Sequence, residues 1–273
     1  MDPFSFAPIA AVLDAAYAVV QGIASLLTPL AGSAAAALAV VAITLILRAV
    51  LIPVGAAQVR AEVARRRLAP RLQALQKRYR KNPQLLQQKT LELYREQKVS
   101  PMAGILPALA QLPVLSIVYA LFIRTRIDGH ANDLLGEHLF GTPLGTSLVH
   151  LISTGGGVAG CILFAALLLV IGAVAWLNRR TALSLAQPAE GTAASIAKAM
   201  SWMPFVTVII AAFVPLAATL YLTTTTVWTF AERALLRRRY GMTGAASGPI
   251  RARRADATAR VARTEPDAGW GER

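Results

Sequence analysis

Long apolar runs separated by short polar segments dominate the pattern of hydrophobic and polar positions along the chain. Several of these runs approach or exceed the roughly 20 residues that an α-helix needs to cross about 30 Å of hydrocarbon. Only 15% of the residues are charged, whereas soluble domains carry about 25%. The pattern therefore predicts an all-α membrane protein that crosses the bilayer more than once.

Five spanning helices account for the apolar runs. The final apolar block, 200–230, is too long for one ordinary span and short for two. We interpret it as two helices that turn near Pro215, because a single span would place the basic C-terminal segment outside, against the positive-inside rule. The predicted spans are 33–58, 100–123, 157–178, 199–214 and 216–236.

The charges of the connecting segments predict the orientation of these spans. Segment 59–98 has 12 basic and 3 acidic residues, and the segment from Ala231 has 10 basic and 5 acidic residues. We expect both on the cytoplasmic side, together with 179–198, while segment 124–156 and the N-terminus lie outside. The C-terminus is then cytoplasmic, and the tail 237–273 is predicted to be basic and disordered.

Two interpretations fit the N-terminal segment, 1–32. Its polar residues recur every three or four positions and so form one stripe along a helix; they are Asp14, Tyr17, Gln21, Ser25 and Thr28. The segment is either a tilted membrane span or an amphipathic helix on the outer membrane surface. The polar stripe favours the surface helix.

The cytoplasmic segment 59–99 predicts a helical hairpin. Leucine and tyrosine recur at helical spacing on both sides of Asn82 and Pro83, which are typical of a turn. The hairpin either anchors to anionic lipid or contacts ribosomal RNA or a targeting receptor, and the same two interpretations hold for the tail. The basic side chains that we assign to these contacts are Arg65, Arg66, Arg67, Arg71, Lys77 and Arg78.

Arg48 is a charge inside the first predicted span, in the stretch TLILRAVLIP. A guanidinium keeps its proton in proteins, and Arg48 lies about 15 Å along the helix from the end of the span at Gln58. Arg48 is therefore either an interfacial anchor, if the span ends at Leu47, or a group that faces protein or a wet cavity. The apolar blocks of the other spans contain no carboxylate, so we expect Arg48 to lack an acidic partner within the chain and to attract one from elsewhere.

Other polar residues of the apolar runs could line the same cavity. Thr44 precedes Arg48 by one helical turn, and Gln111 lies between two prolines of the second span. Four threonines, 223–226, follow one another in the last span, and we assign Thr224 to the cavity. The alternatives are an interhelical hydrogen bond for Gln111 and bonds from the threonines to carbonyls of their own helix.

Residues for covalent chemistry or metal binding form no recognisable motif. His130, His138 and His150 lack the spacing of metal ligands, and the single cysteine, Cys161, lies in an apolar run. Ser153 lacks the flanking glycines of a hydrolase nucleophile. We predict a protein that is not an enzyme, with no catalytic residue, metal or cofactor.

Two segments of the sequence resemble one protein family. They are LILRAVLIPV at 45–54 and, after the basic hairpin, SPMAGILPALAQLPVLSIVYALF at 100–122. An arginine-bearing span, a basic hairpin and a proline-rich span with a glutamine follow in the order typical of the YidC-type membrane protein insertases, which include mitochondrial oxidase-assembly and chloroplast Albino proteins. The resemblance is strong over 40–125 and extends to about residue 235. The chain is similar to the Gram-positive bacterial type, which lacks a large external domain.

The resemblance implies a five-helix core in the bacterial plasma membrane, around a hydrophilic groove that receives polar or acidic segments of nascent membrane proteins. Arg48 would take the role of the groove arginine and Gln111 that of the second-span glutamine, while Tyr221 matches the last span. Two positions depart from the family pattern. Leu222 stands where tryptophan is usual, and a threonine stands where asparagine is common.

The resemblance also implies partners. These are the lipid bilayer, nascent membrane proteins, the Sec translocon and, through the hairpin and tail, the ribosome or a signal-recognition receptor; one copy of the chain would suffice. The alternative function is a small polytopic transporter or channel, which would predict internal repeats and an intramembrane ion site.

Overall fold

The computed structural model describes residues 7–97, 112–127, 130–184, 195 and 198–241. Most of these residues are helical. The helices are α1 (Ala7–Ala31), α2 (Ala35–Val50), α3 (Ile52–Arg78), α4 (Pro83–Glu96), α6 (Leu112–Ile123), α7 (Leu148–Ser153), α8 (Val158–Ser184), α10 (Met203–Phe213) and α11 (Leu216–Arg239). There are also two short 3-10 helices, Gly32–Ala34 and Asp133–Leu135.

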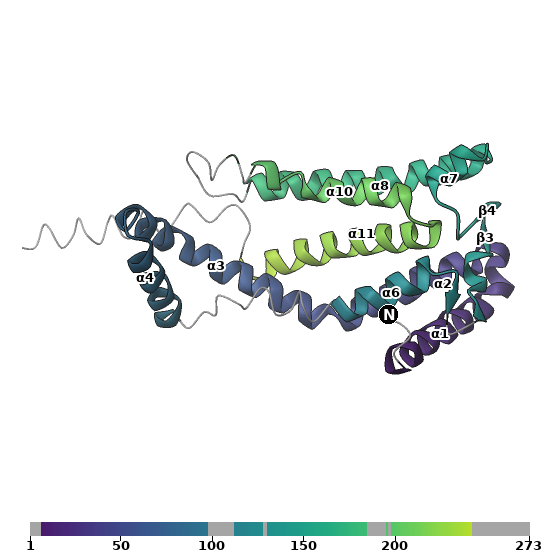
Figure 1. Ribbon diagram of the computed structural model, residues 1–273, viewed down its shortest axis with the longest axis horizontal. Coiled ribbons are helices and arrows are strands. Elements are labelled where there is room, and N and C mark those ends of the chain that lie inside the picture. The colour runs from purple at the N-terminus through teal and green to yellow at the C-terminus, as the bar shows by residue number, and fades with distance from the viewer. Residues whose placement is uncertain (1–6, 98–111, 128–129, 185–194, 196–197, 242–273) are drawn as a thin grey trace, which may run out of the picture.

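Helix α11 is the central element of the molecule. It lies between a layer formed by α8 and α10 and a second layer that contains α2, α3 and α6 (Figure 1). The remote part of α3 and the whole of α4 extend away from these layers at one end (Figure 1). Helix α11 therefore contacts both layers.

The buried core is concentrated at the opposite end from α4. Phe122 of α6, Phe164 of α8 and Leu216 of α11 are completely or almost completely buried there, together with Ile127 and Leu144 of the connecting segment. Large apolar side chains from several elements therefore close this end of the layers.

Helices α2 and α3 meet at Leu51, just after Arg48. Leu51 leaves α-helical geometry (φ −85°, ψ 1°), and Pro53 occupies the first turn of α3, where a missing N–H is tolerated. Helix α3 then continues without interruption past residue 58, where we expected the first span to give way to the hairpin. The break between helices thus lies at Leu51, because a proline favours the first turn of a helix, whereas nothing in the sequence at 58–59 terminates one. The predicted boundary between span and hairpin stays a prediction.

Helix α1 packs against α2 after a turn at Gly32, whose φ of +52° favours glycine. Its buried side chains are Leu13, Val20 and Ala24. The polar stripe lies partly against protein, since the Tyr17 hydroxyl accepts hydrogen bonds from the Gln21 amide (2.8 Å) and from the Asp133 backbone N–H (3.2 Å). The large exposed side chains of α1 are apolar: Val12, Val19, Leu26 and Leu30. Both interpretations of the segment, a tilted span and a helix on the membrane surface, require such an apolar outer face.

The chain between α6 and α8 is more structured than the loop that we predicted for 124–156. Strand β1 (Arg126–Ile127) pairs antiparallel with β2 (His130–Ala131), and β3 (His138–Leu139) pairs with β4 (Thr142–Pro143). Phe140 and Gly141 form the second turn with positive φ values of 50° and 77°, as expected of a two-residue hairpin. The all-α prediction is therefore incomplete in this segment.

Helices α10 and α11 are separate, and the break at Val214 and Pro215 is where the charge argument places the turn. The connecting segment holds the start of α11, because the N–H groups of Leu216 and Ala217 donate to the carbonyls of Thr146 and Leu144, each at 2.9 Å. Two otherwise unpaired donors of the helix N-terminus are thereby satisfied.

Two stretches of the described chain are long and apolar enough to cross a membrane, Ala10–Val50 and Val158–Ser184. The first of them comprises both α1 and α2. The second extends beyond the predicted end at 178. Five spans with the predicted boundaries stay a prediction.

Candidate functional site

Helices α2 and α3 run alongside α11 in the same direction, and three of the contacts between them are regularly spaced. Arg48 contacts Thr225, and Gly55 lies against Glu232, the partners in both cases being 177 residues apart. The third contact joins Glu62 to Arg237, which are 175 residues apart. Residues seven apart lie on one face of a helix. The contacts therefore form a row between two parallel helices.

Arg48 lies in the last turn of α2 and is half-buried. Its Nη2 donates a hydrogen bond of 3.3 Å to the Thr225 hydroxyl of α11. The last turn of a helix favours a cation, because its carbonyls carry the negative end of the helix dipole. The guanidinium is thus oriented across the space between α2 and α11.

Glu232 of α11 is an acidic residue of this row that the sequence pattern did not assign to the site. It follows Thr225 by seven residues and belongs to the next contact of the row, and no ion pair joins it to Arg48 among the described residues. The expectation that Arg48 lacks a salt-bridge partner within the chain stays a prediction, although the last predicted span, 216–236, contains this carboxylate. The apolar block ends at Phe230, and parallel packing brings the next turn of α11 toward Arg48.

The Glu232 carboxylate is held asymmetrically. The Trp228 indole N–H donates to Oε2 at 3.1 Å, while Oε1 is buried and has no hydrogen-bond partner among the described residues. Gly55 provides the space for Oε1, because a Cβ at that position would overlap the carboxylate. A small residue on α3 is therefore needed for this placement.

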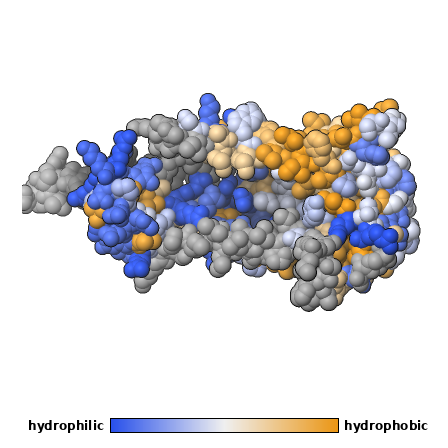
Figure 2. Space-filling view, in the orientation of Figure 1, coloured by the Kyte–Doolittle hydropathy of each residue, from blue (hydrophilic) through white to orange (hydrophobic). Residues whose placement is uncertain are grey.

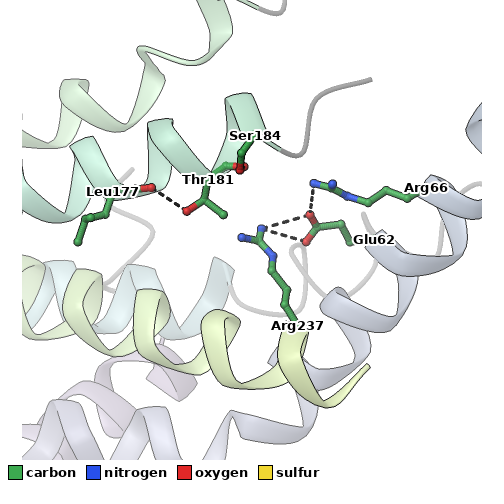
Figure 3. A network of polar contacts seen from close by, with 6 residues as sticks. All are labelled: Glu62, Arg66, Leu177, Thr181, Ser184 and Arg237. Carbon is green, nitrogen blue, oxygen red and sulfur yellow. Dashed lines mark hydrogen bonds and ion pairs between the residues drawn. The ribbon is translucent and has the colours of Figure 1, made fainter. Parts of the chain in front are cut away.

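Glu62 forms the third contact of the row, which Figure 3 shows at close range. Arg66 donates to its Oε1 at 2.9 Å, and Arg237 donates to both oxygens at 3.2 Å. The Arg237 side chain is only 18% exposed, and that of Glu62 is 30% exposed. This network connects α3 to the end of α11.

Three other predicted site residues that the structure describes make contacts outside this row. The hydroxyl of buried Thr44 donates to the Val40 carbonyl at 2.6 Å, and that of Thr224 donates to the Leu220 carbonyl at 2.9 Å. Both threonines thus bond to their own helices. Tyr221 is buried, with its ring 6.2 Å from that of Phe122. Gln111 lies outside the described residues.

Tyr221 borders an apolar pocket between α6, α10 and α11. No polar surface lines it; the residues around it are Val118, Tyr119, Phe122, Ile123, Ile210, Val214, Ala218, Tyr221 and Leu222. Helix α11 therefore contributes to an apolar pocket in its first half and to the polar row in its second half. Figure 2 shows hydrophilic surface set back in the middle of the molecule, beside the hydrophobic surface of α8 and α10.

The predicted basic residues of the hairpin all lie on α3. Arg66 binds Glu62, whereas the remaining five are exposed: Arg65, Arg67, Arg71, Lys77 and Arg78. Arg71 and Arg78 also line a cleft between α3 and α4, opposite Lys89 and Glu92. A hydrogen bond to Glu92, strengthened by its charge, raises the pKa of Lys89.

A family model described as "60Kd inner membrane protein" matches residues 27–243. This chain belongs to that family. The match includes both segments on which the resemblance to YidC-type proteins rests. Curated relatives of this chain are named YidC. The resemblance is therefore confirmed.

Curated relatives named "Membrane protein insertase YidC" match about a third of the chain. The protein from Clostridium perfringens is 36% identical over 96 residues, which are 35% of this chain and 40% of that protein. The protein from Oceanobacillus iheyensis is 37% identical over 92 residues, or 32% of this chain and 36% of its own length. The protein from Bordetella petrii is 42% identical over 87 residues, or 32% and 16%. Each match thus spans less than half of the relative's length.

Proposed function

We propose that this chain is a membrane protein insertase that receives polar or acidic segments of nascent membrane proteins at Arg48. The observation that carries the proposal is the half-buried guanidinium of Arg48, which follows a long apolar stretch and faces the polar side of α11. Membership of the YidC family agrees with this activity.

The proposed core has the five spans predicted from the sequence, in a bacterial plasma membrane, with the N-terminus outside and the C-terminus in the cytoplasm. Two observations support this arrangement. The turn at Pro215 separates α10 from α11, and the basic helices α3 and α4 extend at the end of the molecule away from the buried core. In this orientation the packed end faces outward, and the row from Arg48 to Arg237 opens toward the cytoplasm.

Insertion on this proposal requires no bond to be made or broken. Moving an unpaired polar group into hydrocarbon costs about 2–7 kcal/mol, so a hydrophilic groove lowers the barrier for a polar segment that must enter the membrane. A charge pair is stronger at the lower dielectric of such a groove than in bulk water. Arg48 therefore attracts a carboxylate of the incoming segment, and the apolar pocket beside Tyr221 receives an apolar side chain of the same substrate.

Purified protein in vesicles tests this proposal with two single-span substrates that differ only in Asp or Asn residues of the translocated segment. Arg48→Ala should reduce insertion of the Asp substrate by about tenfold, equivalent to about 1.4 kcal/mol, and affect the Asn substrate less. Arg48→Lys should preserve most of the activity, because it keeps the charge. Equal insertion of the Asp substrate by wild type and Arg48→Ala would disprove the role of Arg48.

We further propose that the exposed basic residues of α3 contact cytoplasmic partners, namely the ribosome, a signal-recognition receptor or the Sec translocon. Binding to ribosomal RNA through phosphates would weaken steeply with salt. Co-sedimentation with ribosomes, with and without residues 241–273, separates the tail from the hairpin. Binding to anionic vesicles in place of ribosomes would support a lipid anchor instead.

A further inference from the structure

Glu232 occupies a position that the proposed capture of acidic segments does not use. Its carboxylate lies over Gly55 and accepts a bond from the indole of Trp228, three residues after Thr225, so it is the neighbour of Arg48 in the row; no ion pair joins the two among the described residues. An incoming carboxylate would therefore meet a site that already contains a negative charge. The two carboxylates would repel each other and compete for the same cation.

The contacts of both groups leave room for such competition. The hydrogen bond from Arg48 to Thr225 is long, at 3.3 Å, and has a neutral acceptor. Charge-assisted bonds to a carboxylate are shorter, about 2.7–2.9 Å, and stronger. If a carboxylate replaces the Thr225 hydroxyl as the acceptor, Arg48 therefore forms a stronger hydrogen bond.

The Glu232 side chain is positioned by three features of the described structure. The Trp228 indole holds Oε2, Gly55 leaves the space that Oε1 fills, and Oε1 itself has no hydrogen-bond donor there. A buried carboxylate oxygen without a donor is costly. The carboxylate is thus held in the row beside Gly55, with one oxygen that has no donor there.

We propose that Glu232 is a specificity-determining residue, an internal acidic competitor that sets how acidic a segment must be before Arg48 receives it. This inference rests on the proposed function of Arg48. A segment with several carboxylates outcompetes Glu232, whereas a weakly acidic segment does not. Basic segments are repelled less than they would be by Arg48 alone.

The test uses the full-length protein in vesicles and the ratio of insertion of the Asp substrate to that of the Asn substrate. The ratio is independent of the amount of active protein, so partial loss of folded variant does not affect it. Glu232→Gln removes the charge and keeps the shape. It should raise the ratio by roughly threefold, as for a partly exposed charge pair. Glu232→Asp, with a shorter side chain, should give a ratio between those of wild type and Glu232→Gln.

A matched control and an epistasis test complete the design. Glu96→Gln changes the net charge equally on exposed α4 and should leave the ratio unchanged. In an Arg48→Ala background, Glu232→Gln should also leave the ratio unchanged, because no cation is left to compete for. A purely structural role of Glu232 would lower insertion of both substrates alike and would overturn the inference.

The outcomes separate this inference from the proposed function. If Arg48→Ala lowers the ratio but Glu232→Gln does not raise it, only the competitor role of Glu232 is wrong. If Arg48→Ala leaves the ratio unchanged, the proposed function itself fails.

Discussion

The two halves of α11 differ in burial and in the kind of contact that they make. From Leu216 to Tyr221 every side chain is buried, and the backbone is tied to the connecting segment. From Thr223 to Arg239 no residue is fully buried, and polar or charged side chains bond to α2 and α3. The difference shows that one end of the molecule is closed by packing, whereas the other leaves charged groups accessible for exchange.

Removing a large side chain from each half tests this contrast most strongly. Leu216→Ala should lower the free energy of unfolding by about 3 kcal/mol, because it leaves a cavity in the packed half. Thermal unfolding in detergent measures the effect. The matched control is Leu235→Ala, since Leu235 lies on the same helix and is 65% exposed. Equal destabilisation by the two variants would remove the distinction between the halves.

Hydrogen bonds of threonines give a smaller and sharper comparison. The hydroxyl of buried Thr219 donates to the Ala211 carbonyl of α10 at 2.9 Å, whereas that of Thr223 donates to the Thr219 carbonyl of its own helix. Thr219→Val should cost about 1 kcal/mol of unfolding free energy, at the upper end of interhelical bonds in membranes.

Thr223→Val should cost less, because the lost bond joins no second element. The same detergent unfolding assay compares the two variants. A larger loss for Thr223→Val would show that the bond between α10 and α11 contributes little to the packed half.

The ion pair at the open end should have the smallest effect. A double-mutant cycle of Glu62→Gln and Arg237→Gln should give a coupling of about 0.5–1 kcal/mol at low salt, falling as salt is added. The control pair, Lys89 and Glu92, is more exposed on both sides and should couple more weakly. A coupling that does not depend on salt would mean that this end is as well shielded from water as the packed half.

The sequence predicts the elements of this molecule better than their mutual orientation. The apolar runs and the charge asymmetry are sufficient to locate the turn at Pro215 and to single out Arg48. The break at Leu51 is harder to predict, because the apolar run continues past it and only Pro53 indicates a new helix start.

Contacts of the candidate site depend on tertiary packing. Four consecutive threonines offer four directions around a helix, and only the packing against α2 selects Thr225 rather than Thr224. A search of the apolar blocks does not find Glu232, because this residue follows the last block. It nevertheless lies seven residues after Thr225, which is the same interval as from Arg48 to Gly55. Matching such intervals between two polar helix faces would have suggested this contact.

The row of contacts has a consequence for the rate at which a substrate can enter. Helix α11 is fixed at its start by the carbonyls of Leu144 and Thr146 and near its end by Glu62. Sliding α11 by one turn would break these contacts together, and such helix shifts take microseconds to milliseconds. On the proposed function, replacement of the Thr225 hydroxyl by a substrate carboxylate needs side-chain rotation, which is faster than such helix shifts. Occupation of Arg48 can therefore change many times while the helices around it keep their places.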